Sequence, residues 1–334
     1  MKRRVVWVSF SPLEKTPAGW TSRMASVRYR LLVPAAALDG EYESKVIHIA
    51  AGANRRTLVE RFQGAHAVVL GKLFGPFKED AEQIPALVEA LRARGTAVLA
   101  DYSDDHFIDR VQGGAYRALA NAVSGVVTST AALATLMKDY TAARVSVITD
   151  PVEGAQQPGR VASRPPCRLL WFGNVQNLDT LKYGLPQLER VADAVPHTLT
   201  LMTAPGAGAE AIAPHRFRPW SVPALGEALQ ECDAVVIPSN PYDPLKAVKS
   251  PNRFTEAVWA GRFVLAHPLP AYQELAGFGW VGDDLGEGLR WLAGNADEAL
   301  QRIQRGQAAI AERFSPRAIA GAWKEAIRSA MPAQ

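Results

Sequence analysis

Short apolar runs bounded by turn residues recur through the first half of this 334-residue chain. They lie at Val5 to Phe10, Ala67 to Leu70, Ala97 to Ala100, Gly125 to Thr128 and Val145 to Ile148. Longer amphipathic segments separate them, and the clearest, Asp80 to Arg94, keeps its apolar side chains on one helical face and is followed by Gly95 as a stop. Continuous apolar strands that alternate with helices are typical of a parallel sheet between two helical layers. The first half is therefore predicted to be a doubly wound α/β domain.

A polar connector rich in Pro and Gly interrupts this pattern between Asp150 and Pro166. Beyond it, apolar runs resume at Arg168 to Phe172, Thr198 to Met202, Ala234 to Ile237 and Phe263 to Ala266. Helices are predicted near Asp179 to Val195, Val222 to Glu231 and Pro251 to Ala260. The second half thus has the pattern of another Rossmann-like domain, and a chain of this length favours two domains of roughly 150 residues each.

Composition adds only broad limits to this picture. A content of 48% hydrophobic and 21% charged residues is typical of a soluble globular protein. The net charge of +4 fits an anionic substrate or a loose attraction to an acidic membrane surface, and no basic run with interleaved aromatic residues indicates nucleic-acid binding. The two cysteines lack metal-ligand spacing, and the apolar run Val5 to Val8 is too short for a signal peptide. We therefore expect a cytoplasmic protein, with peripheral association at the inner face of the membrane compatible with its charge.

The segment that opens the predicted helix at Pro251 carries the strongest chemical signal. Ser250 suits the N-cap, Pro251 the first helical position, and Gly261 the position after the last turn. The positive end of the helix dipole favours an anion, and Lys249 and Arg253 add two cations at the same end. The plainer alternative is a capped surface helix whose charged side chains are solvated.

Two further features make a nucleoside diphosphate sugar the expected ligand of this helix. Asn252 and Glu256 are four residues apart and share a face, so a carboxylate that accepts hydrogen bonds from sugar hydroxyls lies just beyond the anion site. Gly173 and Asn174 follow an apolar strand, and a glycine there lets the backbone approach a phosphate. A tight turn is the alternative interpretation of Gly173.

These residues resemble the donor site of a known enzyme family. The order Lys-Ser-Pro-Asn-Arg-Phe-x-Glu-Ala-x-x-Ala-Gly from Lys249 to Gly261, the Pro-Leu-Pro-Ala-Tyr that ends at Tyr272, and Trp-Phe-Gly-Asn at 171–174 are similar to the GT-B glycosyltransferases, most of all to the family-4 group. The resemblance covers the C-terminal half well and the N-terminal half only in outline.

The resemblance implies two Rossmann-like doubly wound domains that face a cleft. It predicts an acceptor domain at residues 1–152, a nucleotide-sugar donor domain at 153–315, and a last helix at 316–330 that packs back on the first domain. Ile319, Trp323 and Ile327 form the apolar stripe with which this helix would dock. No metal ion and no cofactor is expected, because the helix start, Lys249, Arg253 and Gly173 would stabilise the leaving diphosphate.

One departure from the family pattern concerns the sugar end of the donor. Retaining members of the family-4 group often carry two glutamates separated by seven residues. Glu256 matches the second, but Val248 occupies the position of the first. The loop from Asn240 to Lys246 is the candidate source of the missing sugar contacts, with Asp243 as its best residue.

Candidate residues for the acceptor side lie in the first half. Asp104, Asp105 and His106 follow an apolar strand, and three interpretations stay open for them: a general base, a metal site, or the cap of a helix. Arg23 and Arg28 are candidate contacts for an anionic acceptor or for the donor phosphates, whereas Arg30 is expected to decorate an exposed helix start.

The predicted function is therefore the transfer of a sugar from a nucleotide-sugar donor to a glycan, a lipid-linked or a small-molecule acceptor, for example in polysaccharide biosynthesis. A nucleotide-sugar epimerase of the same fold and a noncatalytic sugar-nucleotide or polysaccharide-binding protein are the alternatives. A dinucleotide oxidoreductase is disfavoured because no Gly-x-Gly-x-x-Gly follows an apolar run.

Overall fold

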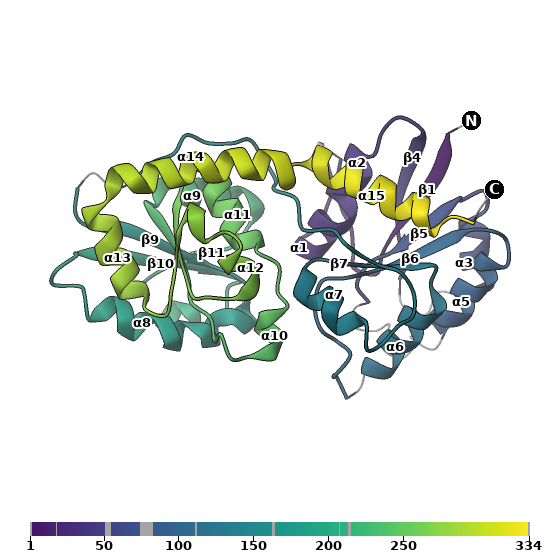
Figure 1. Ribbon diagram of the computed structural model, residues 1–334, viewed down its shortest axis with the longest axis horizontal. Helices are drawn as coiled ribbons and strands as arrows, with labels where there is room; N and C mark the ends of the chain where they lie inside the picture. Colours follow the sequence, from purple (N-terminus) through teal and green to yellow (C-terminus); the bar gives the residue numbers. More distant parts are fainter. Residues whose placement is uncertain are drawn as a thin grey trace. The chain divides into compact units, whose positions relative to one another are not determined.

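The computed structural model describes residues 2–17, 19–50, 55–73, 83–110, 112–161, 164–206, 208–212 and 215–332 (Figure 1). The chain forms two compact units. Unit 1 comprises Met1–Glu153, Val248–Ser250 and Phe314–Gln334, and unit 2 comprises Gly154–Ala247 and Pro251–Arg313. The tripeptide Val248–Ser250 therefore belongs to unit 1, although it lies within the range 153–315 predicted for the second domain.

Unit 1 contains a six-stranded, all-parallel sheet with the strand order β4-β1-β5-β6-β7-β8. Its strands are β1 (Arg3–Ser9), β4 (Tyr42–His48), β5 (Ala67–Leu70), β6 (Ala97–Tyr102), β7 (Gly125–Thr128) and β8 (Val145–Val147). A short antiparallel hairpin, β2 (Glu14–Thr16) and β3 (Gly19–Thr21), follows β1. The predicted doubly wound α/β fold is confirmed for this unit.

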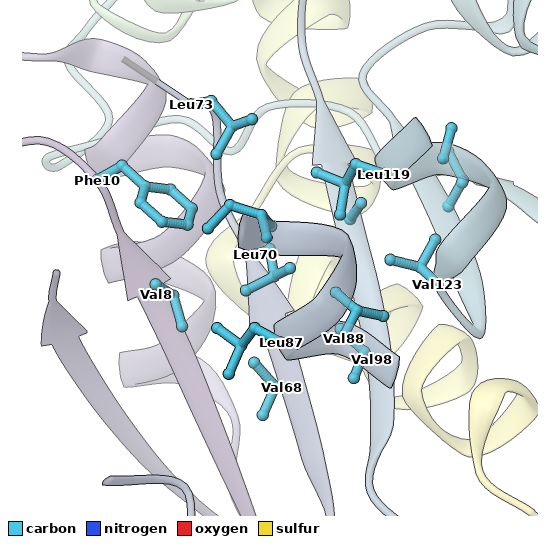
Figure 2. Packing of buried hydrophobic residues seen from close by; sticks show 14 of the residues in the cluster. Val8, Phe10, Val68, Leu70, Leu73, Leu87, Val88, Val98, Leu119 and Val123 are labelled. Atoms are coloured by element: carbon cyan, nitrogen blue, oxygen red, sulfur yellow. The ribbon is translucent and has the colours of Figure 1, made fainter. Parts of the chain in front are cut away.

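The two faces of this sheet bury two separate apolar clusters, because successive strand residues point to opposite sides. Val6, Val8, Val68, Leu70 and Val98 belong to one cluster, part of which is drawn in Figure 2. The strand residues that alternate with them belong to the other cluster. The first face is covered by α3 (Arg55–Arg61), α5 (Gln83–Arg92), α6 (Gly113–Ala122) and α7 (Ala131–Met137). The second face is covered by α1 (Ala25–Val27), η1 (Arg28–Leu32), α2 (Val33–Ala37) and α15 (Pro316–Ala330). Asp80, the predicted start of the helix that ends near Arg94, lies outside the described residues.

The terminal helix α15 buries its apolar stripe in unit 1. Ile319, Trp323 and Ile327 are at most 2% exposed and pack with Val5 and Trp7 of β1. The rings of Trp323 and Trp7 meet edge to face with their centroids 4.9 Å apart. The last segment of the chain thus completes the core of the unit that the first segment begins.

Unit 2 repeats the architecture with the strand order β11-β10-β9-β12-β13-β14, again all parallel. The strands are β9 (Cys167–Phe172), β10 (His197–Thr203), β11 (Arg216–Pro219), β12 (Ala234–Ile237), β13 (Phe263–Ala266) and β14 (Trp280–Val281). The helical segments are η2 (Val175–Thr180), α8 (Leu181–Glu189), η3 (Ala209–Ala211), α9 (Val222–Glu231), α10 (Pro244–Ala247), α11 (Asn252–Trp259), α12 (Pro270–Gln273), η4 (Ala276–Phe278), α13 (Leu285–Gly294) and α14 (Ala296–Arg313). The second Rossmann-like unit is therefore confirmed as well.

Candidate functional site

The sheet of unit 2 has its topological switch point between β9 and β12. From β9 the chain winds outward through β10 to β11, then returns to β12 on the other side and continues outward through β13. Connections that leave neighbouring strands in opposite directions open a crevice at the carboxyl ends of these strands, where ligands of doubly wound sheets bind. Gly173 follows β9, and the segment that leads to α11 follows β12. Both predicted donor segments therefore emerge at this switch point.

The structure brings Gly173 and Arg253 together. The Arg253 guanidinium donates from Nη1 to the carbonyl oxygen of Phe172 at 3.4 Å. A Cβ atom placed on Gly173 would lie 3.5 Å from the same Nη1. A planar cation thus lies beside bare backbone, which is an arrangement that can bind a phosphate group.

A second cation approaches the same loop from α10. Lys246 Nζ donates to Asn177 Oδ1 at 3.0 Å, and a Cβ atom on Gly173 would lie 3.6 Å from Asn177 Nδ2. Neither Lys246 nor Asn177 is singled out by the sequence, although Lys246 closes the loop from Asn240 to which the missing sugar contacts are attributed. The signal that could have identified Lys246 is its place between β12 and α11, at the switch point.

The start of α11 differs from the prediction. The helix begins at Asn252, and Pro251 occupies the N-cap position without a side-chain cap. Ser250, the predicted cap, instead hydrogen-bonds to Asp150 Oδ2 in unit 1. Asn252 Oδ1 accepts from the backbone N–H of Arg253 at 2.8 Å. Gly261 ends the segment as predicted, with a φ of +74° that favours glycine.

The other predicted donor residues lie on the same loops and helix of unit 2. Asn174 caps η2 by accepting from Gln176 N at 3.1 Å. Asp243 Oδ1 accepts from Leu245 N at 2.9 Å, at the start of α10. Glu256 is half-buried on α11. Their predicted roles at the nucleotide and the sugar stay predictions.

In unit 1 the switch point lies between β1 and β5, since β4 is added on one side and β6 on the other. Lys72 follows β5, and Asp104 follows the next strand, β6. Lys249, carried into unit 1 by its tripeptide, pairs with Oδ1 of Asp104, while Lys72 pairs with Oδ2. Lys249 therefore belongs to unit 1 and is partnered by an acid of that unit, and its predicted role at the donor phosphates stays a prediction. Lys72 is not predicted.

The electrostatics of this cluster separate Asp104 from His106. Burial alone would raise the pKa of Asp104, but Lys249 and Lys72 together hold it below its usual range, so the carboxylate is ionised. Burial, with the positive charge of Lys72, lowers the pKa of His106 to about 4, so the imidazole is neutral near pH 7. His106 Nε2 lies 3.7 Å from Asp104 Oδ2, and among the described residues this buried nitrogen has no hydrogen-bond partner. The ring stacks on Tyr116 with centroids 4.8 Å apart.

The structure bears on two of the three interpretations of the acidic segment, the helix cap and the metal site. Asp105 Oδ1 accepts from Phe107 N at 2.9 Å, which closes a turn, and the next described helix, α6, begins only at Gly113. The helix-cap interpretation is therefore wrong. In the part of the chain that the structure describes, no group of three or more His, Cys, Asp or Glu side chains could hold a metal ion.

The three arginines of the first connection have different environments. Arg28 is buried and donates from Nε to Glu153 Oε2 at 2.9 Å and from Nη1 to Ser22 O at 2.9 Å, so the predicted anion contact is corrected to a structural ion pair. Arg30, expected on an exposed surface, is 1% exposed and donates from Nη2 to Asp101 Oδ1 at 2.6 Å. Arg23 is exposed and lies 3.2 Å from Glu14, and its role at the acceptor stays a prediction.

Comparison with known proteins shows that the fold of the whole chain is shared by other solved structures. No family model and no curated protein matches the chain. Among solved structures, Anabaena Alr3699/HepE in complex with UDP-glucose superposes with a TM-score of 0.64 at 13% identity, covering 98% of this chain and 99% of that chain. AviGT4, a glycosyltransferase involved in avilamycin A biosynthesis, superposes with a TM-score of 0.61 at 16% identity, covering 98% and 97%. The chain has the GT-B fold.

Other GT-B structures agree over the same length. The spinosyn forosaminyltransferase SpnP superposes with a TM-score of 0.53 at 14% identity and covers 98% of this chain and 99% of that chain. At these identities the likeness concerns the GT-B architecture, so the chemistry has to be argued from the side chains. Across the described ranges, no helix has the length and apolar character required to cross a bilayer.

Proposed function

We propose that the chain is a glycosyltransferase that binds a nucleotide-sugar donor in unit 2 and an acceptor in unit 1. The observation that carries this proposal is the Arg253 guanidinium beside the backbone of Gly173 at the β9/β12 switch point. Proteins of the same fold are described in complex with UDP or UDP-glucose, and others are named as glycosyltransferases. A guanidinium beside backbone that carries no Cβ suits the binding of a diphosphate.

In this proposal the donor diphosphate occupies the space beside Gly173. Arg253 can bind two phosphate oxygens with its fork of N–H groups, and the absence of a Cβ on Gly173 leaves room for them. Lys246 adds a point charge near Asn177. Glu256 would accept hydrogen bonds from the hydroxyl groups of the ribose, as the resemblance implies. Because these two cations can stabilise the charge that develops on the leaving diphosphate, we propose that transfer proceeds without a metal ion.

We propose His106 as the general base for the acceptor hydroxyl. Its lowered pKa keeps the imidazole unprotonated near pH 7, and a neutral imidazole can take a proton. Asp104 is a weaker candidate, because two lysines hold its carboxylate, but its charge can stabilise the imidazolium that forms at 3.7 Å. We propose that the acceptor is a glycan, a lipid-linked molecule or a small molecule, and that the protein works in the cytoplasm with peripheral association at the inner face of the membrane.

A thermal-shift experiment with UDP and UDP-glucose tests the donor site. A ligand that binds only the folded protein raises its melting temperature by mass action. UDP should stabilise the wild type and fail to stabilise Arg253→Ala. Arg305→Ala is the matched control, because Arg305 of unit 2 is exposed and pairs with Glu298 of the same helix, α14.

Two outcomes would contradict the proposal. Equal stabilisation of Arg253→Ala and the wild type across a panel of nucleoside diphosphates would remove the diphosphate from this position. Conversion of UDP-glucose to an isomeric nucleotide sugar without any acceptor would indicate an epimerase.

A further inference from the structure

We propose that Lys72, Asp104 and Lys249 form a second anion site, in unit 1, which takes a phosphate group carried by the acceptor. Asp104 is its internal counter-ion and holds the two ammonium groups in place until the phosphate arrives. The assignment of this phosphate to the acceptor rests on the proposed function, whereas the anion site itself rests on the geometry of unit 1 alone.

The cluster is assembled from three distant parts of the chain at one edge of one sheet. Lys72 lies two residues after β5 and Asp104 two residues after β6, next to the switch point of unit 1. Both oxygens of Asp104 are engaged, one by each lysine. The side chain of Lys249 is 42% exposed, against 17% for Asp104, so Lys249 is the member that a ligand can reach.

The tripeptide that carries Lys249 is fixed on both sides. Val248 is 5% exposed in the core of unit 1, and its carbonyl oxygen accepts from Thr130 Oγ1 at 2.9 Å. Ser250 hydrogen-bonds to Asp150. A lysine held between two anchors loses little further freedom when it binds a ligand, so its charge is pre-organised.

A structural role alone does not account for Lys249. Lys72 already gives Asp104 a cationic partner, yet the chain brings a second lysine from 145 positions away to the same carboxylate. An exposed ammonium on an occupied carboxylate contributes little to folding stability. The same ammonium can move to a phosphate, which offers more oxygen atoms and more negative charge than one carboxylate.

Removal of the charge of Asp104 should strengthen anion binding, because this counter-ion competes with the ligand for the two lysines. Asp104→Asn should bind inorganic pyrophosphate roughly 5- to 10-fold more tightly, and Lys249→Ala roughly 10-fold more weakly. Both variants are made in the Arg253→Ala protein, so that the donor site of unit 2 does not contribute to the titration. Asp39 and Lys324 provide the matched control, because they form an exposed ion pair elsewhere in unit 1. Asp39→Asn and Lys324→Ala should leave pyrophosphate affinity unchanged.

Calorimetry with pyrophosphate at two salt concentrations measures these affinities, and thermal melts verify that each variant is folded.

Unchanged affinity in both Asp104→Asn and Lys249→Ala would overturn the site. Displacement of pyrophosphate by UDP in the Arg253→Ala protein would assign the cluster to the donor and overturn the acceptor role. Loss of UDP binding in Arg253→Ala tests the proposed function separately, so the two failures are distinguishable. Glucose 1-phosphate and vesicles containing phosphatidic acid then distinguish a soluble phosphate from a lipid headgroup, and either supports the site if Lys249→Ala weakens it.

Discussion

Gly173→Ala separates binding from folding at the proposed donor site. The added methyl group would lie 3.4 Å from Trp171 Cζ2, 3.5 Å from Arg253 Nη1 and 3.6 Å from Asn177 Nδ2, all ordinary van der Waals distances. The fold can therefore accept it without displacement of its neighbours. The same methyl group occupies the space in which a phosphate oxygen would meet the guanidinium.

The expected magnitudes follow from these contacts. Stability should change by less than about 1 kcal/mol, because the unstrained methyl group adds contacts and restricts the unfolded chain. The affinity for UDP should fall by about 1.5–3 kcal/mol, the typical worth of a hydrogen bond to a charged group, which is roughly 10- to 150-fold.

Urea denaturation measures the first quantity and calorimetry with UDP the second. Gly226→Ala is the matched control, because Gly226 lies in α9 with nothing within 4 Å of its added Cβ. It should raise stability by up to about 1 kcal/mol without any effect on UDP. A Gly173→Ala protein that is folded and binds UDP as tightly as the wild type would refute the placement of the diphosphate beside Gly173.

Three further predictions concern unit 1. Val248→Glu, which introduces the first glutamate of the pattern that the donor segment resembles, should lower the free energy of unfolding by more than about 3 kcal/mol in urea, because Val248 is buried; a stable and more active variant would contradict this. Trp323→Ala should cost about 3–5 kcal/mol and Trp323→Phe less, and a loss below about 1 kcal/mol for the alanine variant would disprove the docking of α15. The pKa of His106 falls from 6.5 to about 4 on folding, so the unfolded chain binds the extra proton and stability decreases as the pH falls below 6.5. Between pH 7 and pH 5 the wild type should therefore lose about 2 kcal/mol more than His106→Gln, and parallel pH profiles would show that His106 is not buried in its neutral form.

The interior strands of both sheets could be predicted from the sequence, whereas most of the edge strands could not. The predicted runs at Ala67 to Leu70, Ala234 to Ile237 and Phe263 to Ala266 coincide with β5, β12 and β13, because strands buried on both faces are continuously apolar. The strands β4, β11 and β14 were missed, and all three lie at sheet edges. Their side chains are partly exposed, so polar residues interrupt the apolar pattern.

The candidate site was predictable where it depends on strand ends. Gly173 and Arg253 each follow a strand of one parallel sheet, so their meeting could be expected from topology. The partners of Lys249 and Ser250 could not be predicted, since Asp104 and Asp150 lie at least 100 positions away along the chain. The burial of Arg30 depends on Asp101 in the same way, because only the folded chain brings the carboxylate to the guanidinium.

The tripeptide Val248–Ser250 limits how the two halves of this protein can be exchanged or dissected. A fragment cut at Gly154 and Arg313 would keep Val248 without the apolar surroundings that bury it and would remove Lys249 from the other half. A chimera that imports a foreign unit 2 would have to carry a matching tripeptide for Thr130 and Asp150 of the recipient. Modular engineering of this scaffold should therefore treat these three residues as part of unit 1, wherever the sequence puts them.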